Sequence, residues 1–250
     1  MQADLRDPPS VRAALDGADA AVNALSLYVE SRDATYQAIH VDGAGRLARA
    51  AAEAGLHRLV HISGIGSDAR STSAYIRARG EGEDAVRAVF PGATIVRPSV
   101  MFGPEDAFLT TLVGMVRRLP VVPLFGDGST RLQPVHVEDV AAAVAILLTA
   151  SDLPAPTYEF GGPEVLSYRA LLELVMRHVG RRRPLLPVPF PVWNVLAAAG
   201  RLLPNPPLTE GQVALMRQDN VADPGLPGFA ALGIDPAPIE TELRRRMTQP

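Results

Sequence analysis

A tyrosine and a basic residue stand four positions apart, at Tyr75 and Arg79, inside a segment with helical periodicity. Residues four apart lie on one face of a helix, so the two side chains point the same way. A cation beside a phenol lowers its pKa and lets the hydroxyl act as a general acid or base. The spacing therefore predicts proton-transfer chemistry. A second interpretation stays open, in which Arg79 pairs with Glu83 on a solvated helix face. Arg77 and Glu81 repeat that spacing.

A serine hydroxyl precedes this pair in the sequence. Ser63 precedes Tyr75 by twelve residues and ends an apolar run. Ser63 lies outside any G-x-S-x-G turn, which argues against a serine hydrolase. His57 and His61 straddle a strand start without a nearby carboxylate, so we predict no metal site.

Alternating strands and helices must position these residues. The apolar runs AAVNAL (20–25), RLVHIS (58–63) and ATIVRPS (93–99) are typical of buried parallel strands. Helical spacing covers 36–54, with small residues on one face and Gly55 at its end. A second helix is expected from Ala74 to about Phe90. Repeated strand–helix–strand units imply right-handed crossovers and a parallel α/β sheet.

The pattern loosens after Pro104. We expect a short strand at 135–137, followed by an apolar helix whose first residues include Glu138 and Asp139, where the helix dipole favours acids. A proline-containing break at 151–156 begins a different region. There Ser167 is the expected N-cap of a helix reaching Val179, and Thr209-x-x-Gln212 forms a capping box. The predicted domains are 1–150 and a small C-terminal lobe, 151–250.

Composition excludes several classes of function. A net charge of −3 and a pI near 6.0 argue against nucleic-acid binding. The chain has no cysteine, which excludes disulfides, thiolate metal sites and cysteine nucleophiles. The first residues, MQADLRDPPS, are polar and show no signal-peptide pattern, so a cytoplasmic location is expected.

Three motifs carry a family resemblance. They are HISGIGSDARSTSAYIRARGEGEDAV, IVRPSVMFGPED and GDGSTRLQPVHVEDVA, in this order. Together they resemble an atypical branch of the extended short-chain dehydrogenases, which includes the NAD(P)H-binding accessory subunit of respiratory complex I and its bacterial relatives. The resemblance runs from QADLRD to about residue 220. It implies a Rossmann-type doubly wound parallel sheet that binds NAD or NADP.

The resemblance also implies a missing segment. In such proteins QADLRD follows the third strand, so the first β-α-β unit, with its G-x-x-G-x-x-G turn, would precede this sequence. The first strand would lie at the centre of the sheet. We therefore expect Met1 to be an internal methionine, and the Rossmann domain at 1–150 to be truncated. A domain that functions without the loop is the alternative.

Several positions match the family's cofactor and catalytic residues. The resemblance implies catalytic roles, in degenerate form, for Ser63, Tyr75 and Arg79. Alignment by the strand could equally put Gly64, which has no hydroxyl, in the place of the family's serine. The resemblance also implies cofactor binding by Asp4, Leu5, Asn23, Ala24, Leu25, Ser63, Tyr75, Arg79, Pro98 and Val100. The family's lysine is replaced by Arg79, whose planar guanidinium differs from a compact ammonium. His40 stands where relatives have asparagine.

Three functions remain open on this basis. The first is a nucleotide-binding protein with weak or no turnover that supports a respiratory complex or quinone pathway. The second is an active NAD(P)-dependent reductase or epimerase-like enzyme acting on a small molecule, and the third is a redox-sensing regulator. The apolar stretch 188–203 is too short to span a bilayer. It suggests peripheral contact with an inner membrane, or packing on the C-terminal lobe.

Overall fold

The computed structural model describes residues 3–104, 106–150, 156–200 and 208–248. The chain folds as two compact units. Unit 1 comprises residues 1–97, 142–159 and 224–228, and unit 2 comprises 98–141, 160–223 and 229–250. This division differs from the single boundary expected at residue 150, because the chain leaves unit 1 after β3 and returns to it through a helix and a strand. The predicted break at 151–156 lies outside the described residues, except for Pro156.

Unit 1 is built on a four-stranded sheet with the order β1-β2-β3-β8. The strands are β1 (Ala20–Asn23), β2 (Arg58–Ile62), β3 (Thr94–Pro98) and β8 (Thr157–Phe160). β1 pairs with β2 in parallel, with Val22 opposite Val60, and β2 pairs with β3 in parallel, with His61 opposite Ile95. The three predicted strands are confirmed, each slightly shorter than expected.

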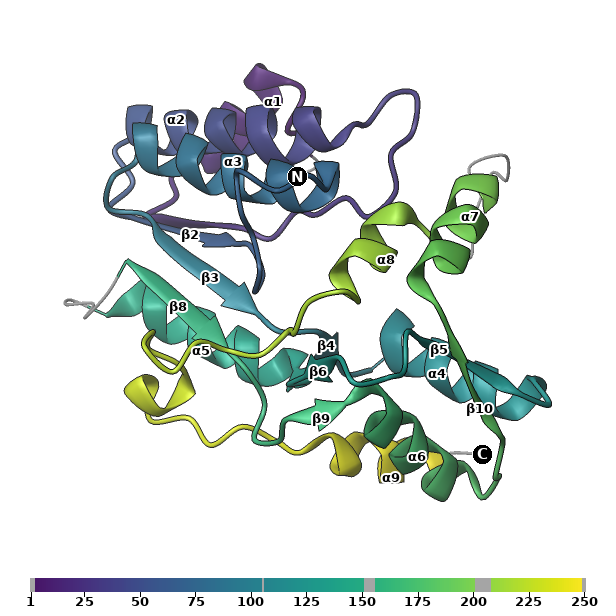
Figure 1. The fold of residues 1–250 in the computed structure, drawn as a ribbon. Helices are drawn as coiled ribbons and strands as arrows, with labels where there is room; N and C mark the ends of the chain where they lie inside the picture. Colours follow the sequence, from purple (N-terminus) through teal and green to yellow (C-terminus); the bar gives the residue numbers. More distant parts are fainter. Residues whose placement is uncertain (1–2, 105, 151–155, 201–207, 249–250) are drawn as a thin grey trace. The chain divides into compact units, whose positions relative to one another are not determined.

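Helices cover one face of this sheet. They are α1 (Pro8–Leu15), η1 (Gln37–Gly43), α2 (Ala44–Glu53) and α3 (Ala74–Val89). Figure 1 shows α2 and α3 alongside β2 and β3, with α1 next to α2. Ala44, Ala48 and Ala51 are fully buried, as the predicted small-residue face requires. A β-carbon on Gly82 of α3 would overlap the carbonyl group of His40 in η1, so a glycine is needed for this close approach.

The helix predicted over 36–54 is confirmed in position but has two parts. Its first two turns, η1, form a π-helix, and α2 continues as a regular α-helix. Gly55 follows with φ +73°, the left-handed conformation expected of a residue that ends a helix. π-helical turns are rare and often occur at functional sites. His40 lies within this segment.

Unit 2 combines helices with short strand pairs. Its elements are β4 (Met101–Phe102), α4 (Ala107–Arg118), β5 (Val122–Phe125), β6 (Arg131–Leu132), β7 (Val135–His136), the start of α5 (Val137–Thr149), β9 (Leu166–Ser167), α6 (Tyr168–Val179), β10 (Leu185–Val188), α7 (Phe190–Gly200), α8 (Glu210–Leu215), η2 (Phe229–Leu232) and α9 (Ile239–Thr248). β4 pairs with β7 and β5 with β10, both in parallel, and β6 pairs with β9 antiparallel. A buried cluster including Phe102, Leu109 and Leu172 forms the core.

Both predicted helix caps are present in unit 2. The Ser167 hydroxyl accepts a hydrogen bond from the Ala170 N–H at the start of α6. Thr209 and Gln212 exchange the two hydrogen bonds of a capping box at the start of α8. Among the described residues, no helix is long and apolar enough to cross a membrane.

Candidate functional site

Tyr75 lies in the first turn of α3 and is buried, with 3% of its surface exposed. Three other rings surround it. The ring centroid of Tyr36 lies 5.4 Å away, that of His40 5.8 Å and that of Tyr28 5.9 Å. The Tyr36 hydroxyl donates to the Tyr28 carbonyl oxygen at 3.0 Å, which ties the segment 28–36 together. The candidate acid–base residue is therefore the centre of an aromatic cluster.

Burial raises the pKa of the Tyr75 hydroxyl above its usual value. The Arg79 guanidinium acts in the opposite direction, because a nearby cation stabilises the phenolate, but it does not cancel the effect of burial. A phenol that serves as a general acid or base near pH 7 needs a pKa lowered toward that value. Tyr75 is shifted the other way.

Arg79 lies against Tyr75, as the spacing of four predicts. Its Cζ is 5.5 Å from the ring centroid, and Nη1 donates to the Tyr75 hydroxyl oxygen at 3.4 Å. The alternative pairing with Glu83 is wrong, because Glu83 instead binds Arg97 and Arg87, at 2.7 and 3.3 Å. None of the ion pairs formed by the described residues includes Arg79.

The companion pair on the same helix does form. Arg77 Nε lies 3.9 Å from a Glu81 carboxylate oxygen, and both side chains are about two-fifths exposed (41% and 39%). This is a solvated pair of the kind the second interpretation describes, and such pairs contribute little to stability. One face of α3 is thus an ordinary solvated surface, while Tyr75 and Arg79 belong to a more buried environment.

Glu83 is the buried centre of a charged network, with a side chain 1% exposed. The Arg97 guanidinium of β3 makes two hydrogen bonds to its carboxylate, at 2.8 and 2.7 Å. Arg97 also contacts Glu159 of β8 at 3.4 Å. Burial raises the pKa of Glu83, but the hydrogen bonds from Arg97 and Ser63 and the charges of Arg97 and Arg87 outweigh it and hold the pKa below its usual range.

Ser63 belongs to this network rather than to Tyr75. Its hydroxyl donates to a Glu83 carboxylate oxygen at 2.6 Å and lies 2.9 Å from the Ser67 hydroxyl. Gly64, the other residue considered for the serine's place, lies directly against Arg79. A β-carbon there would stand 2.6 Å from Arg79 Cζ and 2.7 Å from Nη1. The space beside Tyr75 that a side chain at position 64 would fill is taken by the guanidinium.

Two histidines complete the buried polar layer of unit 1. The Nδ1 atom of His61 lies 3.0 Å from the Asn23 amide nitrogen, and burial lowers the His61 pKa to about 4. The Asn23 amide oxygen accepts from the Leu25 N–H at 3.3 Å. His40 Nε2 lies 3.2 Å from the Leu27 amide nitrogen and 3.0 Å from its carbonyl oxygen, and burial lowers its pKa as well. Both histidines hold the turn after β1.

The roles of His61 and His40 were missed by sequence reasoning, as was the network around Glu83. Several partners come from distant parts of the chain: Asn23 is 38 residues from His61, and Ser63 is 20 residues from Glu83. The available signals were a histidine within an apolar strand pattern for His61 and, for His40, its place where relatives have asparagine. Among the described residues, no cluster of histidine, aspartate and glutamate side chains could hold a metal ion.

The remaining predicted cofactor residues have varied surroundings. Asp4 is bound to Arg6, whose hydrogen bonds lower the Asp4 pKa to about 2. Leu5 is buried in the core beneath α1, whereas Ala24 and Leu25 are exposed. Pro98 and Val100 belong to unit 2. The site described here is therefore the unit 1 group around Tyr75.

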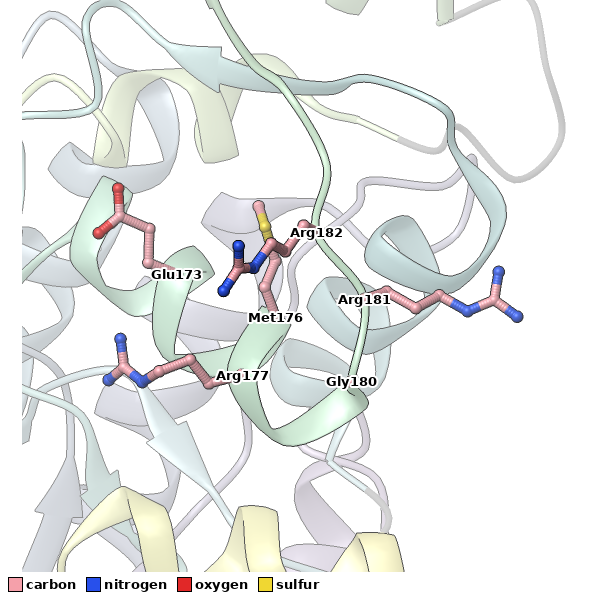
Figure 2. A pocket seen from close by; sticks show the side chains of 6 residues that line it. All are labelled: Glu173, Met176, Arg177, Gly180, Arg181 and Arg182. Carbon is pink, nitrogen blue, oxygen red and sulfur yellow. The ribbon is translucent and has the colours of Figure 1, made fainter.

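An open hollow of about 470 Å³ lies elsewhere, in unit 2 at the end of α6. It is lined by Glu173, Met176, Arg177, Gly180, Arg181 and Arg182. Figure 2 shows the side chains of Arg177 and Arg181 pointing in opposite directions. Cations in the last turn of a helix are favoured by the helix dipole, which accounts for Arg177 without a ligand. The hollow does not gather its charges on one point.

The parallel sheet, its covering helices and the Tyr75–Arg79 pair together define a Rossmann-type α/β protein of the short-chain dehydrogenase class. The NAD dependent epimerase/dehydratase family matches residues 1–161. The chain belongs to this family.

Curated relatives confirm the predicted branch. The chain is 32% identical to subunit 9 of the NADH dehydrogenase [ubiquinone] 1 alpha subcomplex of Rattus norvegicus, over 99% of this chain and 67% of the relative. It is 33% identical to the same subunit of Arabidopsis thaliana, over 88% of this chain and 56% of the relative. The chain thus spans between about half and two thirds of the length of these mitochondrial relatives.

Solved structures agree on the fold. The crystal structure of gox2253 has a TM-score of 0.70 and 20% identity, covering 96% of this chain and 81% of that one. MoeE5, solved in complex with UDP-glucuronic acid and NAD, has a TM-score of 0.64 and 20% identity, covering 74% and 70%. At this identity the likeness establishes the Rossmann-type fold.

Proposed function

We propose that this chain provides the Tyr75–Arg79 side of a dinucleotide site, in a protein of the complex I accessory-subunit type with little or no turnover. The observation that carries the proposal is the state of Tyr75. The phenol is buried under Tyr28 and Tyr36, its pKa is raised, and its cationic neighbour is an arginine. These features oppose efficient proton transfer at neutral pH.

The cofactor of the proposal is NAD or NADP. Family membership and the NAD bound to MoeE5 support a nicotinamide dinucleotide. Arg79 fits the role of a contact to such a ligand, because its donors are not used in any ion pair of the described residues. A bound nicotinamide supplies or accepts a hydride. Tyr75 and Arg79 would hold the adjoining part of the ligand, and the proton step would fall to the poorly tuned Tyr75.

Pyrophosphate binding in this fold depends on a glycine-rich turn at a helix N-terminus. The 250-residue sequence contains no G-x-x-G-x-x-G motif. We therefore expect the chain alone to bind NADH and NADPH weakly. The same chain fused to the N-terminal segment of the Rattus norvegicus relative should bind with ordinary affinity.

The test is a calorimetric titration of both dinucleotides into the chain alone and into the fused protein, with a hydride-transfer assay on carbonyl and sugar-nucleotide substrates. The fused protein should bind and turn over slowly. Arg79→Lys should leave binding nearly unchanged and raise any rate, because acid–base tuning contributes about a hundred- to ten-thousand-fold. Robust turnover with Arg79 that Arg79→Lys fails to improve would contradict the proposal, as would tight binding by the chain alone.

Two other functions rest on specific features. Retention of Tyr75 supports an active reductase or epimerase-like enzyme, and loss of a strong activity in Tyr75→Phe would favour it. A redox-sensing regulator would bind oxidised and reduced dinucleotide with different affinity in the same calorimetric experiment. Partnership with respiratory complex I or a quinone-pathway protein rests on the relatives' identity.

Peripheral membrane contact through α7 is supported by its exposed side chains. Val192, Val195 and Leu196 are 46, 69 and 51% exposed. Trp193 differs from these residues, since its Nε1 donates a hydrogen bond to the Leu124 carbonyl oxygen within unit 2 at 3.0 Å. Residues 201–203 of the predicted segment lie outside the described residues. A cytoplasmic protein peripheral to an inner membrane would sediment with anionic vesicles, and Val195→Asp would reduce that binding.

A further inference from the structure

The Arg79 guanidinium packs directly against the backbone of Gly64, so that it is seated on this glycine. The guanidinium lies so close to the glycine that a β-carbon would stand 2.6 Å from Cζ and 2.7 Å from Nη1. Real side chains do not approach that closely, so any residue other than glycine would push the guanidinium aside. The displaced group is the far end of a flexible chain, and the backbone need not move. Gly64 therefore sets where the charge of Arg79 lies rather than whether unit 1 folds.

The Arg79 guanidinium is half-buried, and it has more N–H donors than the described residues use. With the described residues it makes one side-chain hydrogen bond, the long 3.4 Å contact with the Tyr75 hydroxyl. Glu83, the carboxylate four residues away, is occupied by Arg97, Arg87 and Ser63. No described carboxylate pairs with Arg79. A guanidinium carries five donors in a planar fork, and leaving a partly desolvated cation without an acceptor is unfavourable.

The planar shape of the guanidinium indicates which class of ligand it would bind. A planar guanidinium matches the paired oxygens of a carboxylate or a phosphate and binds them through two parallel hydrogen bonds. A ribose diol, the ligand expected for a lysine at this position, does not need that geometry. The Tyr75 hydroxyl stands beside the fork and offers a further donor to the same oxyanion.

We propose that Arg79, seated on Gly64 and flanked by Tyr75, forms an oxyanion subsite for a carboxylate or phosphate group of the ligand. The inference deepens the proposed function, on which it rests for the role of the site, by naming the ligand class. It assigns Gly64 as a positioning residue, because that residue acts through the location of Arg79.

The experiment titrates the 250-residue chain with sodium phosphate and, separately, with sodium malonate at constant ionic strength and pH 7. Binding is followed by calorimetry and by the NMR signals of the arginine Nε–H groups. Saturable binding is expected for at least one anion, and the comparison tells phosphate from carboxylate. Arg79→Gln should weaken that binding by about tenfold or more, since charge-assisted hydrogen bonds are lost.

Matched variants separate a subsite from general charge effects. Arg77→Gln removes the same charge from the same helix, two residues away, and should leave anion binding within about twofold of the unmodified chain. Gly64→Ala should weaken binding as Arg79→Gln does while leaving the unfolding midpoint nearly unchanged. Adding Arg79→Lys to Gly64→Ala should restore part of the binding, because the smaller ammonium needs less space than the fork.

Equal anion affinity in the unmodified chain and in Arg79→Gln would overturn the subsite. Full binding in Gly64→Ala would contradict the role of Gly64 in positioning Arg79. The result is independent of the dinucleotide titration described above. Failure of the fused protein to bind NADH would count against the proposed function alone, whereas loss of the Arg79 dependence would count against this inference alone.

Discussion

Glu83 links three elements of unit 1 through an ion pair and hydrogen bonds. Its side chain lies on α3 and is 1% exposed. Its carboxylate accepts hydrogen bonds from Arg97 of β3 and from Ser63, which follows β2. Removing one partner of a buried ion pair leaves the other charge without compensation, which is far more costly than losing an exposed pair. Because the Glu83 carboxylate binds Arg97 and Ser63, it does not pair with Arg79 on the same helix.

Glu83→Gln is expected to destabilise the chain by about 2–4 kcal/mol, since the largely buried Arg97 would lose its closest carboxylate and keep only the 3.4 Å contact with Glu159. Glu81→Gln is the matched control on the same helix, and it should cost less than about 1 kcal/mol because the Arg77–Glu81 pair is partly exposed. Urea unfolding at pH 7 measures both changes. Similar losses in the two variants would show that the buried network contributes no more than a surface pair.

His61 makes stability depend on pH. Its folded pKa is about 4 and its ordinary value is 6.5, so the unfolded chain binds more protons between these limits. Stability therefore rises with pH across this window, and acidification from pH 7 to pH 4 should remove up to about 3 kcal/mol through this residue. His61→Gln, which cannot take the charge, should flatten the profile measured by urea unfolding. An unchanged slope in this variant would assign the effect to other groups.

At the scale of elements, the contact between α3 and η1 depends on Gly82. A β-carbon there would meet the carbonyl group of His40, whose backbone cannot retreat without moving the π-helix. Gly82→Ala should therefore cost about 1–3 kcal/mol or more, against the usual helix preference for alanine. Gly114→Ala in α4 is the control, because nothing lies within 4 Å of its added carbon, and it should stabilise the chain by up to about 1 kcal/mol. Thermal unfolding compares them, and a stabilised Gly82→Ala would contradict the packing.

The elements that were predictable are those whose signal is local. Buried parallel strands such as β2 are short apolar runs, and the caps at Ser167 and Thr209 involve residues three positions apart. The partner of Glu83 was not predictable, because Arg97 is 14 residues away on a strand that the spacing rules for a helix do not reach. The π-helical form of η1 was not predicted, since a segment of seven residues is too short for its apolar spacing to distinguish a π-helix from an α-helix. The Gly64–Arg79 contact depends on how β2 and α3 pack.

At the scale of the whole molecule, family membership and the state of the site point in different directions. The family is named for NAD dependence, and the relatives from Rattus norvegicus and Arabidopsis thaliana are subunits of a mitochondrial NADH dehydrogenase [ubiquinone]. The Tyr-x-x-x-basic spacing is kept, but the phenol is buried and the cation is a guanidinium seated on Gly64. A scaffold that binds a dinucleotide without turning it over would have little need of a tuned phenol.

The pKa of Tyr75 tests this account most directly, and it needs neither substrate nor cofactor. The chain has five tyrosines, and an ultraviolet or carbon-13 NMR titration of the unmodified chain compared with Tyr75→Phe isolates the one of interest. We predict that Tyr75 titrates above the ordinary value of 10.0, because burial outweighs the charge of Arg79. A tyrosine titrating well below that value, and absent from Tyr75→Phe, would contradict the account and identify a site prepared for catalysis.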